Sequence, residues 1–220
     1  MSLPGFMQAP PRRGFFTPVH SYDGAMPTTH LLYLHGFRSS PQSMKARQVA
    51  ERVQAQHPGV VWWCPQLPPS PREAMDLVMQ GIAGWPLDTM AVVGSSLGGF
   101  YAARVAENTG CPAVLLNPAV DPARDLAKYI GEQTGWHDPA ERFFFRPEFI
   151  GELQALNTGP LTRLQRYFAV IAKGDEVLDW REMTARCAGA RLKLLEGGDH
   201  ALSDFDAHID EVLAFLELAR

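Results

Sequence analysis

The stretch Met90-Ala91-Val92-Val93-Gly94-Ser95-Ser96-Leu97-Gly98-Gly99-Phe100 decides the interpretation of this chain. A short apolar run passes directly into G-x-S-x-G and then into a helical pattern, as in a strand that turns sharply into a helix. A backbone that turns so tightly is strained, and Gly94 and Gly98 remove the side chains that would collide there. The turn leaves the hydroxyl of Ser96 exposed at the carboxyl end of the strand. The stretch therefore predicts a serine nucleophile at Ser96.

Apolar runs typical of buried strands alternate with helical patterns on both sides of this stretch. Strands are expected at residues 31–34, 60–64, 90–93, 113–116, 167–172 and 191–195, and helices at 42–56, 72–82, 97–107, 180–187 and 203–218. Continuous Val, Ile and Leu runs between helices indicate a parallel sheet that is covered on both faces. The pattern predicts a compact α/β fold around a mainly parallel sheet of about six strands.

One long interruption separates the fourth and fifth expected strands. Residues 120–166 are too many for a plain connection and are rich in aromatic side chains, so we expect a small helical cap there. Residues 29–220 are expected to form a single domain that carries this cap as an insertion. Residues 1–28 contain prolines and arginines without a continuous apolar core, and they indicate a flexible leader rather than a secretory signal.

A serine hydroxyl needs a base to take its proton, and the base needs an acid to orient it. Asp175 and His200 each follow an expected strand and a glycine, in the chain order Ser, Asp, His that suits a nucleophile on a strand-to-helix turn. Asp179 is a second candidate for the acid, although it can also cap a helix. Asp121, after the fourth strand, is a third. The preferred triad is Ser96, Asp175 and His200.

The oxyanion that forms during acyl transfer needs two preorganised donors. The backbone N–H of Leu97, the residue after the nucleophile, is one expected donor. The second should come from the loop after the first strand, where Phe37 follows Gly36 and glycine lets the backbone approach the substrate. The N–H groups of Phe37 and Leu97 are therefore the expected oxyanion hole.

Four residues are candidates for the wall of the substrate pocket. Arg38 can attract an anionic group of a substrate, or it can be a solvated loop residue. Trp136 and Phe144 belong to the aromatic set of the cap, which favours an apolar acyl group, although a phenylalanine cluster is first of all core. Trp180 lies close to the acid loop in sequence and can line the pocket or pack in the core.

The composition excludes several other classes of function. A formal net charge of -4 without a basic run argues against nucleic-acid partners and against attraction to anionic membranes. No apolar stretch approaches the roughly 20 residues that span a bilayer. Three widely spaced cysteines suggest neither a metal site nor a disulfide framework, and they favour a reducing compartment, the cytoplasm. We expect no metal and no cofactor, and the oligomeric state stays open.

Five segments together resemble one family of hydrolases. They are residues 32–37 with the following Ser39-Ser40-Pro41, residues 94–102, Asn117-Pro118-Ala119-Val120, residues 174–179 and residues 198–201. In this order they are similar to the YqiA-like small bacterial esterases of the α/β-hydrolase superfamily. The resemblance covers most of the chain from residue 31 onward, and the chain departs from it in the long leader and in Arg38. It implies a compact α/β-hydrolase fold with Ser96, Asp175 and His200 as the triad.

The resemblance also implies esterase activity on small or short-acyl substrates. We therefore expect a serine esterase that forms an acyl-enzyme with a small-molecule acyl ester or thioester. The same triad can serve a thioesterase, an amidase or a peptidase, and the residues do not distinguish these. A non-catalytic binding module is the remaining alternative, although no triad or glycine position is missing.

Overall fold

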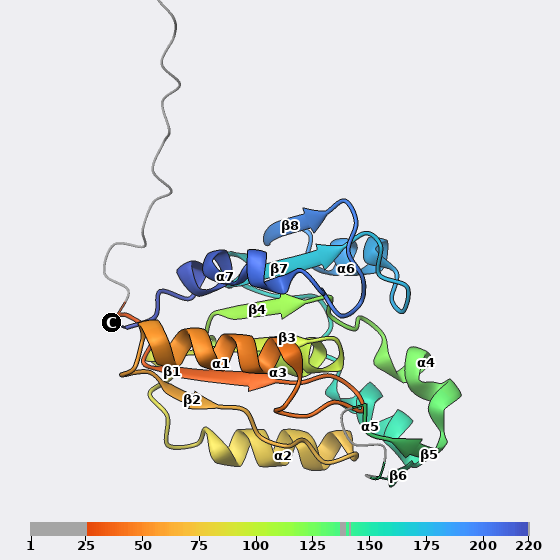
Figure 1. Ribbon diagram of the computed structural model, residues 1–220. Coiled ribbons are helices and arrows are strands. Elements are labelled where there is room, and N and C mark those ends of the chain that lie inside the picture. Colours follow the sequence, from red (N-terminus) through yellow and green to blue (C-terminus); the bar gives the residue numbers. More distant parts are fainter. Residues whose placement is uncertain (1–25, 137–139, 141, 220) are drawn as a thin grey trace, which may run out of the picture.

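The computed structural model describes residues 26–136, 140 and 142–219. Residues 1–25 of the expected leader lie outside the described residues. Thr28 is buried, its N–H donates to the carbonyl of Glu217, and its carbonyl accepts from the N–H of Ala219. The two ends of the described chain therefore lie side by side (Figure 1), and Thr28 packs with the C-terminal end rather than apart from the domain.

Six parallel strands form the central sheet, as expected. They are β1 (His30–Leu34), β2 (Val61–Trp63), β3 (Met90–Ser95), β4 (Ala113–Leu116), β7 (Tyr167–Ala172) and β8 (Arg191–Leu195), in the order β2-β1-β3-β4-β7-β8. Every residue of β3, β4 and β7 is buried, because neighbouring strands cover their edges and helices cover both faces. Strand bounds differ from the expected ones by at most two residues.

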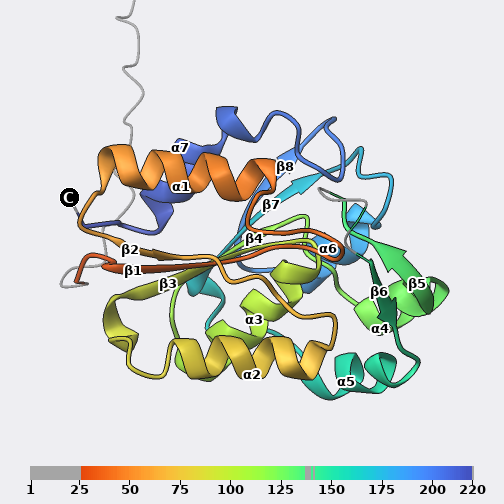
Figure 2. The same cartoon turned by 60° about the horizontal axis from the view of Figure 1, so that its bottom comes forward.

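Helices cover both faces of the sheet (Figure 2). One face carries α1 (Met44–Gln56) and α7 (Ile209–Phe215), and the other carries α2 (Pro71–Gly81), α3 (Leu97–Thr109), α5 (Glu148–Leu156) and α6 (Trp180–Arg186). Successive strand residues point to opposite faces, so Leu32 and Leu34 join the core under α2 and α3, while Leu31 and Tyr33 join the core under α1 and α7. Short 3-10 turns lie at Leu87–Thr89, Ala127–Tyr129, Leu164–Arg166 and Phe205–Ala207.

The cap differs from the expected helical one. It contains α4 (Pro122–Leu126) and α5, but between them lies an antiparallel hairpin of β5 (Gly131–Thr134) and β6 (Arg142–Phe145). The run of three phenylalanines at 143–145 favours a strand, since aromatic side chains pack well on a pleated surface. Phe145 points into the core and Phe144 points outward. The cap is therefore mixed rather than helical.

The final helix is also shorter than expected. It begins at Ile209 rather than at Ser203, because the N–H and the hydroxyl of Ser203 both bond to the carboxylate of Asp199 and hold a separate turn. Among the helices of the described residues, none combines the length and the apolar character needed to cross a bilayer.

Candidate active site

The strand order puts a crevice above β1 and β3. From β1 the chain moves outward to β2, and it then returns to β3 on the other side of β1. Loops that leave neighbouring parallel strands in opposite directions leave a crevice at the carboxyl ends, where ligands of such sheets bind. Ser96 follows β3, and the loop of residues 35–38 follows β1, so both lie at this crevice.

Ser96 has the strained backbone that the motif predicts. Its φ of 56° and ψ of −121° lie in a backbone region that residues other than glycine rarely adopt. A Cβ on Gly94 would lie 2.1 Å from the carbonyl oxygen of Gly98, and a Cβ on Gly98 would lie 1.9 Å from the carbonyl oxygen of Leu34. Only glycine fits at either position, which explains the motif physically.

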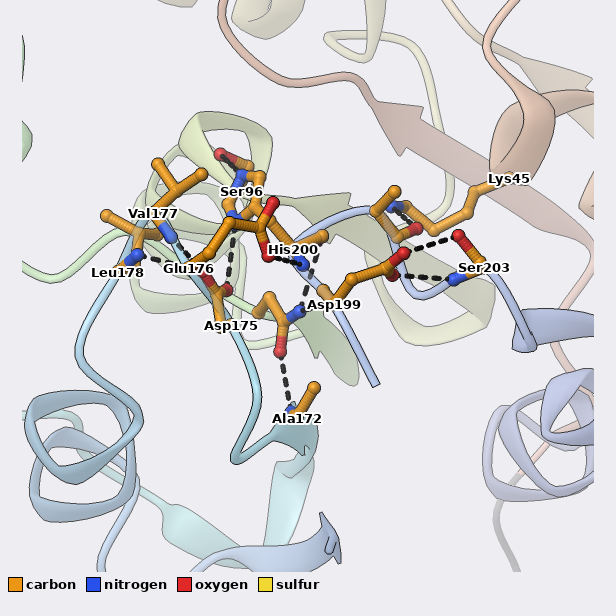
Figure 3. A network of polar contacts seen from close by, with 12 residues as sticks. Lys45, Ser96, Ala172, Asp175, Glu176, Val177, Leu178, Asp199, His200 and Ser203 are labelled. Atoms are coloured by element: carbon orange, nitrogen blue, oxygen red, sulfur yellow. Dashed lines mark hydrogen bonds and ion pairs between the residues drawn. The ribbon is translucent and has the colours of Figure 1, made fainter. Parts of the chain in front are cut away.

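The side chains of Ser96, His200 and Asp175 form one chain of hydrogen bonds (Figure 3). His200 Nε2 lies 3.0 Å from Ser96 Oγ, and His200 Nδ1 lies 2.8 Å from Asp175 Oδ2. A carboxylate accepts only from a protonated nitrogen, so the imidazole carries its proton on Nδ1 and offers the Nε2 lone pair to the serine hydroxyl. The three expected residues are brought together in an arrangement that can move a proton off Ser96.

Three hydrogen bonds and burial fix the carboxylate of Asp175. Asp175 Oδ1 accepts the N–H groups of Val177 and Leu178, each at 2.8 Å, and the side chain of Asp175 is closed to solvent. Its second oxygen is thereby left to orient the imidazole.

The alternative acids are used elsewhere. Asp179 caps α6 by accepting the N–H of Arg181 at 2.9 Å. Asp121 caps α4 by accepting the N–H of Arg124 at 3.2 Å. The structure therefore favours Asp175 as the acid of the triad.

Asn117 holds the loop that carries His200, and no sequence pattern indicates this role. Its side chain is fully buried, and its Nδ2 donates to the carbonyls of Asp199 at 3.0 Å and His200 at 3.3 Å. Its Oδ1 accepts the N–H of Ala172 at 2.8 Å. The Asn117-Pro118 pair directly after β4 is the only local pattern at this position, and it equally indicates a simple end of the strand.

Two further side chains anchor the same loop from other elements. Glu176 Oε2 accepts the N–H of His200 at 3.0 Å. Lys45, near the start of α1, donates from Nζ to the carbonyl of Ala201. Burial lowers the pKa of Lys45 to about 8, although the carboxylates of Asp199 and Asp175 act in the opposite direction. Nothing in the sequence singles out Lys45, because its helix position is ordinary.

The loop after β1 lies against the nucleophile. A Cβ on Gly36 would lie 3.2 Å from Ser96 Cβ and 3.6 Å from Ser96 Oγ, so glycine lets this backbone approach. The N–H groups of Phe37 and Leu97 donate to no other described residue, which leaves them available for a substrate oxygen. The ring of Phe37 packs on those of three aromatic residues of the cap, Tyr129, Phe143 and Phe145.

A cavity of about 490 Å³ opens above Ser96 and His200. Apolar side chains line most of it, among them Met44, Leu97, Leu126, Tyr129 and Val177. In the described part of the chain, no group of three or more His, Cys, Asp or Glu side chains is placed to hold a metal ion.

Two of the four expected pocket residues line this cavity. Arg38 and Trp136 do so, and the guanidinium of Arg38 stacks 4.4 Å from the Trp136 ring centre while donating to the carbonyl of Thr134 at 2.6 Å. Phe144 is instead 54% exposed on the outer face of the hairpin. Trp180 packs against the core under α6, so the expectation for these two residues needs correction.

Comparisons with known proteins agree with this fold. A family model described as "Uncharacterised protein family (UPF0227)" matches residues 30–217. A putative hydrolase from Agrobacterium vitis S4 superposes with a TM-score of 0.67 at 18% identity, covering 86% of this chain and 88% of that one. Mouse alpha/beta hydrolase domain-containing protein 10 gives a TM-score of 0.65 at 16% identity, covering 87% and 92%. Est1E from Butyrivibrio proteoclasticus, solved with ferulic acid bound, gives 0.60 at 14% identity, covering 89% of each chain. At these identities the shared property is the α/β-hydrolase fold.

Proposed function

Because the chain belongs to the uncharacterised protein family UPF0227, that of the YqiA-like proteins, and has an α/β-hydrolase fold, we propose that it is a serine hydrolase of carboxylic esters. The observation that carries this proposal is the unbroken chain from Ser96 Oγ through His200 to the buried carboxylate of Asp175. The strained backbone at Ser96 adds support, since strain of this kind is kept where it serves a function.

The reaction begins with the attack of Ser96 Oγ on the ester carbonyl carbon while His200 Nε2 takes the hydroxyl proton. The electron pair of the carbonyl moves onto its oxygen, and the N–H groups of Phe37 and Leu97 bind that oxyanion. The oxyanion then collapses, the bond to the leaving oxygen breaks, and His200 returns its proton to the leaving alcohol. The product of this half-reaction is an acyl-serine and a free alcohol.

Water completes the cycle by the same route. His200 takes a proton from the attacking water, and the tetrahedral oxyanion forms again. Its collapse breaks the bond to Ser96 Oγ, and His200 returns the proton to that oxygen, so the carboxylic acid leaves and the serine hydroxyl is restored. Asp175 stabilises the imidazolium each time, because its Oδ2 accepts from Nδ1 throughout. No step needs a group beyond these side chains and backbone donors.

The same geometry is compatible with thioesters or amides, and proteins of similar structure include a thioesterase domain as well as an esterase domain. The acyl group is expected to be apolar, since most of the cavity lining is apolar. Three free cysteines support a reducing compartment such as the cytoplasm.

Labelling with a fluorophosphonate tests the proposal directly. We expect mass spectrometry to find the adduct on Ser96, no adduct in Ser96→Ala, and an unchanged adduct in the matched control Ser95→Ala. Turnover of a 4-nitrophenyl ester should fall at least ~10³-fold in Ser96→Ala and His200→Ala. Hydrolysis retained by pure Ser96→Ala would overturn the proposal.

A matched set of substrates separates the alternatives. A 4-nitrophenyl ester, a 4-nitrothiophenyl ester and a 4-nitroanilide with one common acyl group differ only in the atom that joins the acyl group to the ring. If none of the three compounds is hydrolysed and the fluorophosphonate does not label Ser96, a non-catalytic binding module is favoured.

A further inference from the structure

Lys45 is a charged residue of the cavity that the proposed reaction does not use. It lies in the first turn of α1, lines the cavity, and donates from Nζ to the carbonyl of Ala201 (Figure 3). An ammonium has three N–H donors, and this bond uses one of them. The acceptor is a neutral carbonyl, so the contact does not compensate the positive charge.

The carboxylates near Lys45 are all engaged by other donors. Asp175 binds His200 and two backbone N–H groups, and Asp199 binds the N–H and the hydroxyl of Ser203. Glu176, which also lines the cavity, accepts the N–H of His200. Within the described residues no carboxylate forms an ion pair with Lys45.

The other charges that line the cavity are also accounted for. Asp125 is paired with Arg124 at 2.8 Å, and Arg38 is bonded to Thr134. Lys128 lies on the cap, with its ammonium over the ring of the neighbouring Tyr129. Arg38, Lys45 and Lys128 are positive and Asp125 and Glu176 are negative, so the cavity lining keeps a net positive charge, and Lys45 is the cation beside the base.

A partly buried ammonium without an anionic partner is unfavourable, because burial removes part of its hydration. Burial is the largest influence on the pKa of Lys45, and it disfavours the charged form. An anionic group of a substrate in the cavity would restore the lost interaction through a charge-assisted hydrogen bond.

The position of Lys45 identifies which part of the substrate it faces. In the proposed reaction His200 Nε2 gives its proton to the leaving oxygen, so the leaving group lies beside His200. Lys45 bonds to Ala201, the residue after His200, and so it lies on this side of the cavity. The cap residues Leu126 and Tyr129 supply the apolar surface for the acyl chain.

We propose that Lys45 binds a carboxylate on the leaving group, so that the preferred substrates are acyl esters of hydroxy acids. This proposal rests on the proposed esterase function, because the leaving group is placed beside His200 on the ground that His200 gives it a proton.

The test compares two butyryl esters that differ by one carboxylate. One is the ester of 4-nitrophenol, and the other is the ester of 5-hydroxy-2-nitrobenzoic acid. We expect kcat/KM to favour the carboxylate ester in the unaltered protein, Lys45→Arg to keep most of this preference, and Lys45→Met to lower the ratio about tenfold. Arg47→Met, an exposed residue of the same helix, removes the same charge and should leave the ratio unchanged.

The outcomes separate this role from a purely structural one. If Lys45 only holds the loop of Ala201, Lys45→Met will slow both esters equally and the ratio will not change, which overturns the proposal. An equal ratio in all four proteins overturns it as well.

Binding without turnover separates this proposal from the function on which it rests. Equilibrium dialysis of Ser96→Ala with the two free phenols should show tighter binding of 5-hydroxy-2-nitrobenzoate, lost when Lys45→Met is added. If no ester is hydrolysed and Ser96 is not labelled, the proposed function fails, and the dialysis alone then decides whether Lys45 binds a carboxylate.

Discussion

Replacing Asn117 with alanine should both destabilise the fold and slow the reaction, because its side chain joins the sheet to the loop of the base. The N–H of Ala172 is fully buried, so the loss of its acceptor costs about 2 kcal/mol. The carbonyls of Asp199 and His200 lie nearer to solvent, and water can replace part of their lost bonds, which limits their share to about 1 kcal/mol.

The backbone at this position adds to the effect. Asn117 has a φ of 41°, and alanine is less tolerant of that region than asparagine, at a cost of about 1 kcal/mol. We therefore expect Asn117→Ala to lower the free energy of unfolding by about 4 kcal/mol, a large part of the stability of a single domain. A displaced His200 should also lower kcat about 10²-fold while KM changes little.

Urea unfolding followed by tryptophan fluorescence measures the stability, and turnover of a 4-nitrophenyl ester well below the unfolding transition measures kcat. Asn157→Ala is the matched control, because Asn157 is exposed and its side chain accepts only the N–H of Gly159. That control should stay within about 0.5 kcal/mol of the unaltered protein. An Asn117→Ala protein that unfolds within 1 kcal/mol of the unaltered one, or keeps its kcat within twofold, would refute the reasoning.

Three other perturbations test separate parts of the site. Gly36→Ala should lower kcat for ester hydrolysis about tenfold without unfolding the protein. The added Cβ would lie 3.2 Å from Ser96 Cβ and slightly displace the loop that carries the N–H of Phe37. An unchanged kcat would contradict the role of this loop in binding the oxyanion. Arg38→Gln should raise KM severalfold but preserve fluorophosphonate labelling of Ser96. The change removes the stacking on Trp136 and the hydrogen bonds to Thr134, which join the cap to the loop after β1. Unchanged KM values would show that the cap does not depend on these contacts. The preference for the carboxylate ester should fade as pH rises through about 8, where Lys45 loses its charge, and a pH-independent ratio of the two esters would count against the charge of Lys45 as its source.

Much of this site could be predicted from local patterns. Glycine spacing around Ser96 and its position between an apolar run and a helical pattern depend only on sterics within a few residues. Strand-end positions likewise indicated Asp175 and His200, since residues at the carboxyl ends of parallel strands share one edge of a sheet.

Other features depend on contacts between distant parts of the chain. Asn117 and Asp199 are separated by 82 positions, and Lys45 and Ala201 by 156, so no local periodicity relates them. The hairpin in the cap is hard to predict from periodicity, because a strand of four residues is too short for its repeat to be told from that of a helix, although its phenylalanines favour a strand.

By itself, then, the sequence determined the candidate nucleophile, the order of the proposed triad and the parallel six-stranded sheet, because these follow from short-range sterics and from the burial of apolar runs. The tertiary structure decided that Asp175 rather than Asp179 contacts His200, that Arg38 bonds to Thr134 of the cap, and that Lys45 lies beside His200, bonded to the carbonyl of Ala201. These choices follow from the strand order β2-β1-β3-β4-β7-β8, which brings the separate strand ends together. The physical reason is that a side chain's partners are set by which elements pack beside it, and that packing is a property of the whole chain.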